Sequence, residues 1–302
     1  MIREAIATLI DGRDLTRAEA REVMGEMMSG EASPAQMGGF LAVLRAKGET
    51  ADEIAGCAEA MRAHALQVRP ARADLVDVVG TGGDGARSFN ISTAAALVTA
   101  AAGAAVAKHG NRAVTSASGS ADVLEALGFE IEQPPERIAA SIDELGFGFM
   151  FAQSHHPAMK HAAPVRRELG TRTVFNVLGP LTNPAGARAQ VIGVFAPSLV
   201  RTIGDVVAQL GAERAFVVHG FAGIDELSPC GPNLVAEVRG GEVVERVVDP
   251  RDLGFEPRDP AELTGGTAVE NAEAIRGILA GDVRDARRDA VLLNAAGGIA
   301  AA

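Results

Sequence analysis

A change of pattern after residue 74 constrains the fold more than any other feature of the sequence. Beyond this point, short apolar runs typical of strands alternate with segments of helical periodicity. Such alternation is typical of a mostly parallel sheet flanked by helices, and it predicts an α/β domain over residues 75–302. The strand-like runs are LVDVV, AAVAKH, FGFMF, AQVIGVF and RAFVVHG, followed by NLVAEVRGGEVVERVV, which predicts a hairpin that turns at Gly240-Gly241.

Residues 1–68 carry helix start signals and no strand-like run. In a capping box, Ser or Thr is followed three residues later by Glu or Gln, and the two side chains satisfy free N–H groups at a helix start. Each box here precedes apolar residues at helical spacing, so the sequence predicts a small α-helical domain over residues 1–68. The segment VRPARAD (68–74) would link it to the α/β domain. The boxes pair Thr16 with Glu19, Ser33 with Gln36 and Thr50 with Glu53.

Charge and composition exclude several classes of partner. The chain of 302 residues has a net charge of −11 and contains no Trp and no Tyr. It therefore lacks the positive field and the aromatic stacking surfaces that proteins use to bind nucleic acid, and its field disfavours anionic membranes. No apolar run is long enough for a membrane span, and no signal-peptide pattern is present. Because Cys57 and Cys230 form no disulfide or metal motif, we expect reduced thiols and a cytoplasmic location.

The stretch GTGGDGARSFNIST (80–93) reproduces the spacing of the dinucleotide-binding fingerprint through Gly80, Gly82 and Gly85. In that fold the helix begins inside the glycine motif, and an acidic residue about 20 positions further on binds the ribose hydroxyls. Here the helix is predicted to begin only near Ser92-Thr93, and residues 85–121 contain no Asp or Glu. The sequence therefore argues against a nicotinamide or flavin site.

The same acid-free segment favours a phosphate ligand. In a chain with a large negative charge, it contains Arg87, Lys108 and Arg112. Glycine-rich loops and helix N-termini expose backbone N–H groups that bind phosphate oxygens. The glycine-rich loop, KHGNR (108–112) and TSASGSAD (115–122) follow successive predicted strands or precede helices. Any one of them could be a simple turn or helix cap, whereas the three together predict a ligand with more than one phosphate group.

Six segments in order resemble one family, the anthranilate phosphoribosyltransferases. They are GTGGD (80–84), NIST (90–93), KHGNR (108–112), GSADVLEALG (119–128), HPAMKHAAPVRRELGTRTVFNVLGPLTNPA (156–185) and GIDELS (223–228).

The resemblance implies a small α-helical domain, joined by helices from about residues 157–185, and a larger α/β domain with the active site between them. It also implies a cytoplasmic homodimer that pairs through the helical domain and requires Mg²⁺. The implied reaction transfers the phosphoribosyl group of 5-phosphoribosyl 1-pyrophosphate (PRPP) to the amine of anthranilate, in tryptophan biosynthesis.

The resemblance also assigns site residues. Anthranilate would contact Gly80, Asn111 and Arg166, and Mg²⁺ would be held by Ser92, Asp225 and Glu226. The implied mechanism needs no strong nucleophile, and a dedicated base is optional, because the enzyme would work by positioning and electrostatics. The implied PRPP site consists of Gly80, Gly83, Asp84, Ser88, Asn90, Ile91, Ser92, Thr93, Lys108, His109, Gly110, Asn111, Arg112, Ala113, Val114, Thr115, Ser116 and Ser120.

Two alternatives remain open from the residues. A pyrimidine nucleoside phosphorylase-like enzyme shares the fold and also works at ribose C1, and a non-catalytic relative could bind nucleic acid. The sequence GTGGD followed by NIST disfavours the first, while the net charge and the Asp225-Glu226 pair disfavour the second. A zinc site among His155, His156 and His161 is not expected, since no carboxylate or Cys clusters with them in sequence.

The sequence departs from the family pattern at three places. His155 stands where many relatives carry Tyr, and Ala117 stands where some carry Lys. The family also continues for another helix or two beyond GGIAAA, the last residues of this sequence. We expect the first two departures to alter ligand contacts without changing the chemistry.

Overall fold

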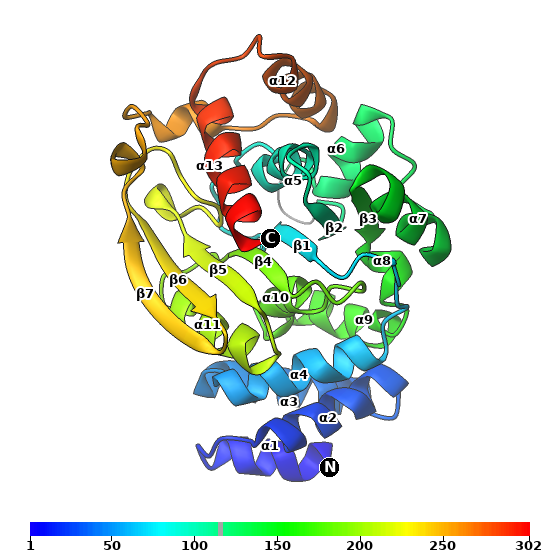
Figure 1. Cartoon of the computed structure of the whole chain (residues 1–302). Coiled ribbons are helices and arrows are strands. Elements are labelled where there is room, and N and C mark those ends of the chain that lie inside the picture. The colour runs from blue at the N-terminus through cyan, green and yellow to red at the C-terminus, as the bar shows by residue number, and fades with distance from the viewer. Residues whose placement is uncertain (114–116) are drawn as a thin grey trace.

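The helical part of the chain forms as its start signals predict. The computed structural model describes residues 1–113 and 117–302. The capping boxes of Thr16, Ser33 and Thr50 are all formed, each with both of its hydrogen bonds. Figure 1 shows the resulting layer of helices at one end of the molecule, which we call the helical bundle. It consists of α1 (Ile2–Ile10), α2 (Arg17–Ser29), α3 (Pro34–Lys47) and α4 (Ala51–Ala63).

Within the described residues, seven strands form one sheet in the order β3-β2-β1-β4-β5-β6-β7. The five strands from β3 to β5 are parallel, and β6 and β7 form an antiparallel hairpin whose turn is Gly240-Gly241, as predicted. A mostly parallel sheet with an antiparallel edge is the result. The strands are β1 (Leu75–Gly80), β2 (Ala105–Gly110), β3 (Phe147–Phe151), β4 (Ala189–Gly193), β5 (Arg214–His219), β6 (Asn233–Arg239) and β7 (Glu242–Val248).

Helices cover both faces of the sheet (Figure 1). On one face, α5 and α13 pack on the central strand β1, and α6 shares a buried cluster with β1, β2 and β3. On the other face, α7 packs on β2 and β3 while α11 packs on β5, β6 and β7. These helices are α5 (Ile91–Ala101), α6 (Ser120–Leu127), α7 (Pro135–Leu145), α11 (Leu199–Gln209) and α13 (Ala286–Ala301), with α12 (Ala268–Ala280) against α6.

Helix α11 joins the helical bundle to the sheet. Its side chains Ile203 and Val206 are buried in one hydrophobic cluster that also contains Ile54 of α4 and Val217 of β5. Since α11 contacts α4 as well as the strands, the two parts of the molecule share a continuous core.

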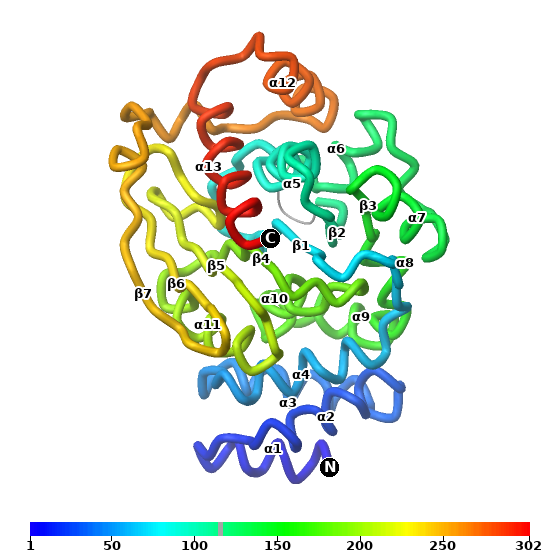
Figure 2. The backbone as a smooth tube through the Cα atoms, in the orientation of Figure 1, coloured from blue at the N-terminus to red at the C-terminus, as the bar shows by residue number. Residues whose placement is uncertain are grey.

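The chain passes between the two parts at three places in its described length, at residues 64–74, 152–158 and 182–188 (Figure 2). The passages are bonded to one another: Leu66 N donates to the His155 carbonyl at 2.8 Å, His155 Nδ1 lies 2.9 Å from the Leu66 carbonyl, and Val68 N donates to the Pro184 carbonyl at 3.1 Å. Between the second and third passages, α9 packs on α2 and α3, and α10 packs on α4. These segments are α8 (Ala152–His155), α9 (Met159–Leu169) and α10 (Phe175–Leu178).

Candidate functional site

The candidate site lies at the carboxyl ends of the parallel strands, where ligands of open α/β sheets bind. Strands β1, β2, β4 and β5 end at Gly80, Gly110, Gly193 and His219. The loops that follow β1, β2 and β5 carry most of the residues expected from the sequence. Their convergence is a consequence of the parallel topology, which brings the same ends of these strands to one edge.

Two of the strand-end glycines are required by the close approach of Asp225. A Cβ on Gly80 would collide with the Asp225 carboxylate, and a Cβ on Gly193 would collide with the Asp225 backbone carbonyl. Gly82 N also donates to Asp225 Oδ2 at 2.6 Å. The segment after β5 is therefore held directly over the ends of β1 and β4, and only glycine leaves room for it.

Buried acids concentrate negative charge at this point. Asp225 and Glu226 are 8% and 7% exposed, and Asp225 N donates to Asp84 Oδ2 at 3.2 Å. Burial, then repulsion from Glu226 and Asp84, raises the pKa of Asp225 well above its usual range. Burial raises the pKa of Glu226 to about 7, against the opposing attraction of Lys108. Such a set of hard oxygen donors, costly when ionised without a cation, fits a divalent metal ion.

The start of α5 brings a helix N-terminus to the same acids. The helix begins at Ile91, one residue before the expected position, and Ser92 N donates to Glu226 Oε1 at 3.0 Å. Asn90 makes no side-chain cap; its Nδ2 donates to the Ser118 carbonyl at 3.1 Å, and its Oδ1 accepts from Asn271 Nδ2 at 2.9 Å. The structure thus brings Ser92 and Glu226 together at a helix end whose dipole favours anions.

The loop between β1 and α5 offers free backbone donors. We call residues 81–85 the glycine loop; three of its residues, Gly82, Gly83 and Gly85, have φ between 70° and 78°. Within the described residues, no hydrogen bond uses the backbone N–H groups of Gly83, Asp84 or Gly85. These N–H groups are therefore open to an acceptor such as a phosphate oxygen. Beyond the loop, Ser88 pairs with Thr264 in an isolated bridge.

Lys108 is buried among acids. Its side chain is 1% exposed, and Nζ donates to the Val78 carbonyl at 2.7 Å. Burial lowers the pKa of Lys108, while the charges of Asp77 and Glu226 oppose the shift. Burial also raises the pKa of Asp77 to about 6, and Asn183 Nδ2 donates to its Oδ2 at 2.8 Å. Sequence analysis missed Asp77 and Asn183; an acid inside the apolar run LVDVV was the available signal for the first.

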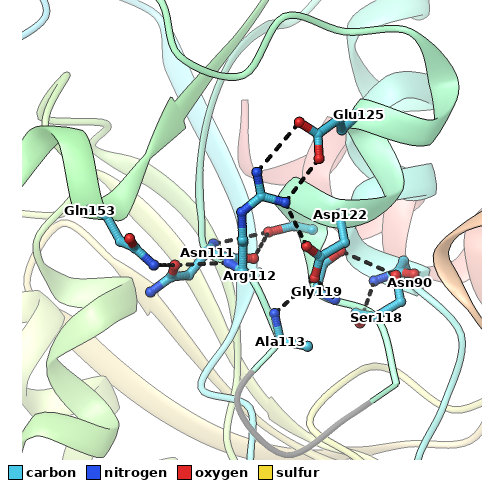
Figure 3. A network of polar contacts seen from close by, with 10 residues as sticks. Asn90, Asn111, Arg112, Ala113, Ser118, Gly119, Asp122, Glu125 and Gln153 are labelled. Atoms are coloured by element: carbon cyan, nitrogen blue, oxygen red, sulfur yellow. Dashed lines mark hydrogen bonds and ion pairs between the residues drawn. The ribbon is translucent and has the colours of Figure 1, made fainter.

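The guanidinium of Arg112 is engaged by acids of α6, as Figure 3 shows. It donates to Asp122 at 2.9 Å and to Glu125 at 2.9 Å. Asp122 Oδ2 also accepts from Ala113 N and Gly119 N, so that Ala113 and Gly119 are both bonded to the first turn of α6.

Asn111 and Ser120 lie beside each other in the same network. Asn111 N donates to Ser120 Oγ at 3.1 Å, and Gln153 Nε2 donates to Asn111 Oδ1 at 3.4 Å (Figure 3). Gly110 ends β2 directly before Asn111, and Thr93 lies in the first turn of α5. Of the expected PRPP set, Val114, Thr115 and Ser116 lie outside the described residues.

Two buried histidines face each other near the end of β2. The rings of His109 and His156 lie 5.1 Å apart, and His109 Nδ1 lies 3.1 Å from the Gly179 carbonyl. Neither Nε2 atom has a hydrogen-bond partner among the described residues. Burial lowers the pKa of His109 to about 3 and that of His156 to about 4, so both are neutral at pH 7.

Arg166 lies on α9, on the side of the helical bundle. Its guanidinium carbon is 5.0 Å from the centroid of the Phe175 ring, a cation–π contact. No acidic side chain pairs with it in the part of the chain that the structure describes. Burial lowers its pKa. A half-buried guanidinium without a carboxylate is suited to receive one from a ligand.

The acids alone do not form a complete metal cage. In the described ranges, 1–113 and 117–302, no three His, Cys, Asp or Glu side chains are grouped for metal binding. Mg²⁺ usually binds one or two protein carboxylates and completes its shell with water and substrate phosphates. Asp225 and Glu226 fit this pattern.

Among the helices of the described chain, none has the length and apolar character needed to cross a membrane.

Comparison with known proteins agrees with this geometry. The model of the glycosyl transferase family, helical bundle domain, matches residues 3–65, and that of its a/b domain matches residues 72–302. Over 302 residues the chain is 56% identical to an anthranilate phosphoribosyltransferase of Anaeromyxobacter dehalogenans, covering 100% of this chain and 89% of the relative. The chain belongs to the anthranilate phosphoribosyltransferase family.

Solved structures of the anthranilate phosphoribosyltransferase family share the fold over almost the whole chain. The crystal structure from Thermus thermophilus has a TM-score of 0.94 at 50% identity and covers 99% of this chain and 89% of that one. The Saccharomyces cerevisiae enzyme in complex with PRPP and Mg has a TM-score of 0.89 at 27% identity, with coverage of 98% and 86%. The expected fold class, a small helical domain with a larger α/β domain, is confirmed.

Proposed function

We propose that this chain transfers the 5-phosphoribosyl group of PRPP to the amine of anthranilate, giving N-(5-phosphoribosyl)anthranilate and pyrophosphate. The observation that carries the proposal is the buried Asp225-Glu226 pair beside the open N–H groups of the glycine loop. This arrangement matches the charge pattern of a magnesium pyrophosphate group, and it occurs in a member of the anthranilate phosphoribosyltransferase family.

In this proposal the glycine loop and the α5 start bind the phosphates of PRPP. The N–H groups of Gly83, Asp84 and Gly85 donate to no other group within the described chain, and the helix dipole adds a favourable field. Asp225, Glu226 and Ser92 would hold Mg²⁺ against the pyrophosphate. When bound, Mg²⁺ would neutralise the phosphate charge and assist departure of pyrophosphate.

The acceptor side of the reaction requires orientation more than proton transfer. The amine of an aromatic acid such as anthranilate is weakly basic and neutral at pH 7, so it can attack ribose C1 without a dedicated base. Arg166 would bind the anthranilate carboxylate, with Asn111 and Gly80 completing that subsite. The protein would contribute mainly by holding the two substrates in line.

The test is a continuous assay of anthranilate fluorescence, which should fall when PRPP and Mg²⁺ are added. The chain has no Trp or Tyr, so its own emission does not interfere. Omitting PRPP or removing Mg²⁺ with EDTA should abolish the change. A parallel reaction with thymidine and phosphate should release no thymine; release of thymine without loss of anthranilate would assign the protein to nucleoside phosphorolysis.

We further propose a homodimer formed through the helical bundle, in the cytoplasm. The dimer is an expectation from the family, and the free cysteines Cys57 and Cys230 are compatible with a reducing compartment. Sedimentation equilibrium should give twice the chain mass. Substituting the exposed Ile10 of α1 with Glu should weaken association if α1 lies at the interface, whereas a monomer at all concentrations would contradict the dimer.

A further inference from the structure

Arg172 lies between α9 and α10, two helices that pack on the helical bundle, and its side chain contacts the glycine loop. It follows α9, whose cap is Gly170, in the segment that leads to α10. Its guanidinium donates a hydrogen bond to the carbonyl oxygen of Gly83. The same guanidinium lies over the Phe195 ring, 4.2 Å from its centroid, just after the end of β4. One exposed side chain therefore touches two separate segments of the α/β domain.

The contacts of the Arg172 guanidinium are with a backbone carbonyl and an aromatic ring. Among the described residues, no acidic side chain forms an ion pair with Arg172, and its hydrogen-bond acceptor is a backbone carbonyl. Stacking on Phe195 fixes the plane of the guanidinium, which favours a directed hydrogen bond. The Gly83 carbonyl belongs to the peptide group whose N–H is that of Asp84. A cationic donor at the oxygen polarises this peptide and strengthens its N–H as a donor.

The other anchors of the glycine loop act on Thr81, on Gly82 and on the side chain of Asp84, whose Oδ2 accepts from Asp225 N at 3.2 Å. Phe195 N donates to Thr81 Oγ1 at 3.2 Å, and Gly82 N donates to Asp225 Oδ2 at 2.6 Å. Since Gly82, Gly83 and Gly85 adopt the left-handed region, the loop has little steric restraint of its own. Arg172 adds a hydrogen bond at the carbonyl of the Gly83–Asp84 peptide, in the middle of the three open N–H groups.

We infer that Arg172 is a positioning residue, which orients the glycine loop so that its free N–H groups receive the pyrophosphate of the phosphoribosyl donor. The inference rests on the proposed function, which provides the donor. It concerns binding of the donor, and it leaves anthranilate binding to other residues.

Steady-state kinetics of R172A test the inference. We expect the KM for PRPP to rise about tenfold or more, and the KM for anthranilate to change less than about twofold. R172K should recover only part of the loss, because an ammonium keeps the charge without the planar stacking on Phe195. The matched control is R167A, an exposed arginine of α9 without an ion pair in the described structure, which should behave as wild type.

Binding of inorganic pyrophosphate with Mg²⁺, measured by calorimetry, provides a readout that does not need turnover. Its Kd should rise about tenfold in R172A and remain unchanged in R167A. If R172A fails to fold by circular dichroism, F195L removes the stacking platform instead and should raise the same Kd. If the wild-type protein is inactive with PRPP and anthranilate, the proposed function is overturned. If the wild-type protein is active, and R172A has an unchanged KM for PRPP and an unchanged Kd for pyrophosphate, the inference alone is overturned.

Discussion

The pair Asp225-Glu226 has an electrostatic cost that a cation would remove. Both acids are buried, and burial raises the pKa of each above its usual range. The positive charge that acts on Glu226 is that of Lys108, which also acts on Asp77. A site of this kind is organised for an incoming positive charge at the expense of the stability of the free protein.

The double variant D225N/E226Q tests this interpretation. It keeps the shape of both side chains and removes their charge, so we expect turnover to fall by about 10²-fold or more, equivalent to about 2.7 kcal/mol. The melting temperature without Mg²⁺ should stay equal or rise, because the buried charges are gone. The fluorescence assay and a thermal melt measure the two effects. Near-normal turnover would refute the metal assignment.

Arg166 is expected to act on anthranilate alone. In R166A the KM for anthranilate should rise about tenfold with a smaller change in kcat, since a carboxylate contact present in both ground and transition states is lost. The KM for PRPP should remain within about twofold, as the variant leaves the glycine loop intact. Varying each substrate at saturation of the other separates these constants, and an unchanged anthranilate KM would remove Arg166 from that subsite.

His156 makes stability depend on pH. Burial lowers its pKa from 6.5 to about 4, so between these values the unfolded chain binds a proton that the folded chain does not. Acid therefore lowers the free energy of unfolding, by about 2 kcal/mol between pH 7 and pH 5 for this one group. In H156Q the loss over that range should be smaller by about this amount, measured by urea denaturation. The exposed His64, changed to Gln, serves as the control.

Among single residues, the sequence pointed to some members of the candidate site and missed others for a physical reason. Asp225 and Glu226 stand in a short segment that resembles the family, so their roles could be proposed without a structure. Arg172 and Asp77 act through contacts made by folding: Arg172 meets a carbonyl 89 positions away, and Asp77 meets an amide 106 positions away. Arg172 also lies in a segment that resembles the family, and Asp77 lies in an apolar run, but neither segment indicates which distant group the side chain will contact.

Among the elements, the ends of β1 and β4 fix where the site can form. Gly80 and Gly193 occupy adjacent strands in register, and the segment after β5 lies over both. A side chain at either position would displace Asp225. The geometry of the site thus depends on two residues that act by the absence of a side chain.

G193A should disturb the protein at this point. Its Cβ would overlap the Asp225 carbonyl, so we expect a loss of about 2 kcal/mol in the free energy of unfolding and a large fall in turnover. The comparison variant is G25A, in the middle of α2, where a Cβ meets open space. That change should be neutral or stabilising by about 0.5–1 kcal/mol. Equal behaviour of the two variants would contradict the close packing described for Gly193.

Elements with local signals and the mostly parallel sheet were predicted from sequence, and the order of the strands was not. Capping boxes and the Gly240-Gly241 turn act within a few residues, and each is formed as predicted. The strand order is set by contacts between distant segments, which periodicity does not encode. The short helices α8 and α10, four residues each, depend on their surroundings because so few hydrogen bonds do not sustain an isolated helix.

For the whole molecule, the shared core predicts cooperative unfolding. Ile54 of the helical bundle and Ile203 of α11 lie in one buried cluster with strand residues. I54A should therefore lower the free energy of unfolding of the entire chain by about 3 kcal/mol, with a single transition in calorimetry and circular dichroism. L145A, at a position on α7 that is 75% exposed, should change it by less than about 0.5 kcal/mol. A separate early transition of the bundle would show that the parts are independent.

The path of the chain between its two parts limits how such a protein could be divided or recombined during evolution. A gene split in the linker at 64–74 would place α1 to α4 in one product, while α9 and α10, which pack on those helices, would stay with the sheet in the other. Exchange of the first 68 residues with those of a distant relative would likewise place new helices against the α9 and α10 of this chain, which did not evolve with them. Substitutions on the surfaces of α2, α3 and α4 are therefore expected to co-vary, during evolution, with substitutions on α9 and α10.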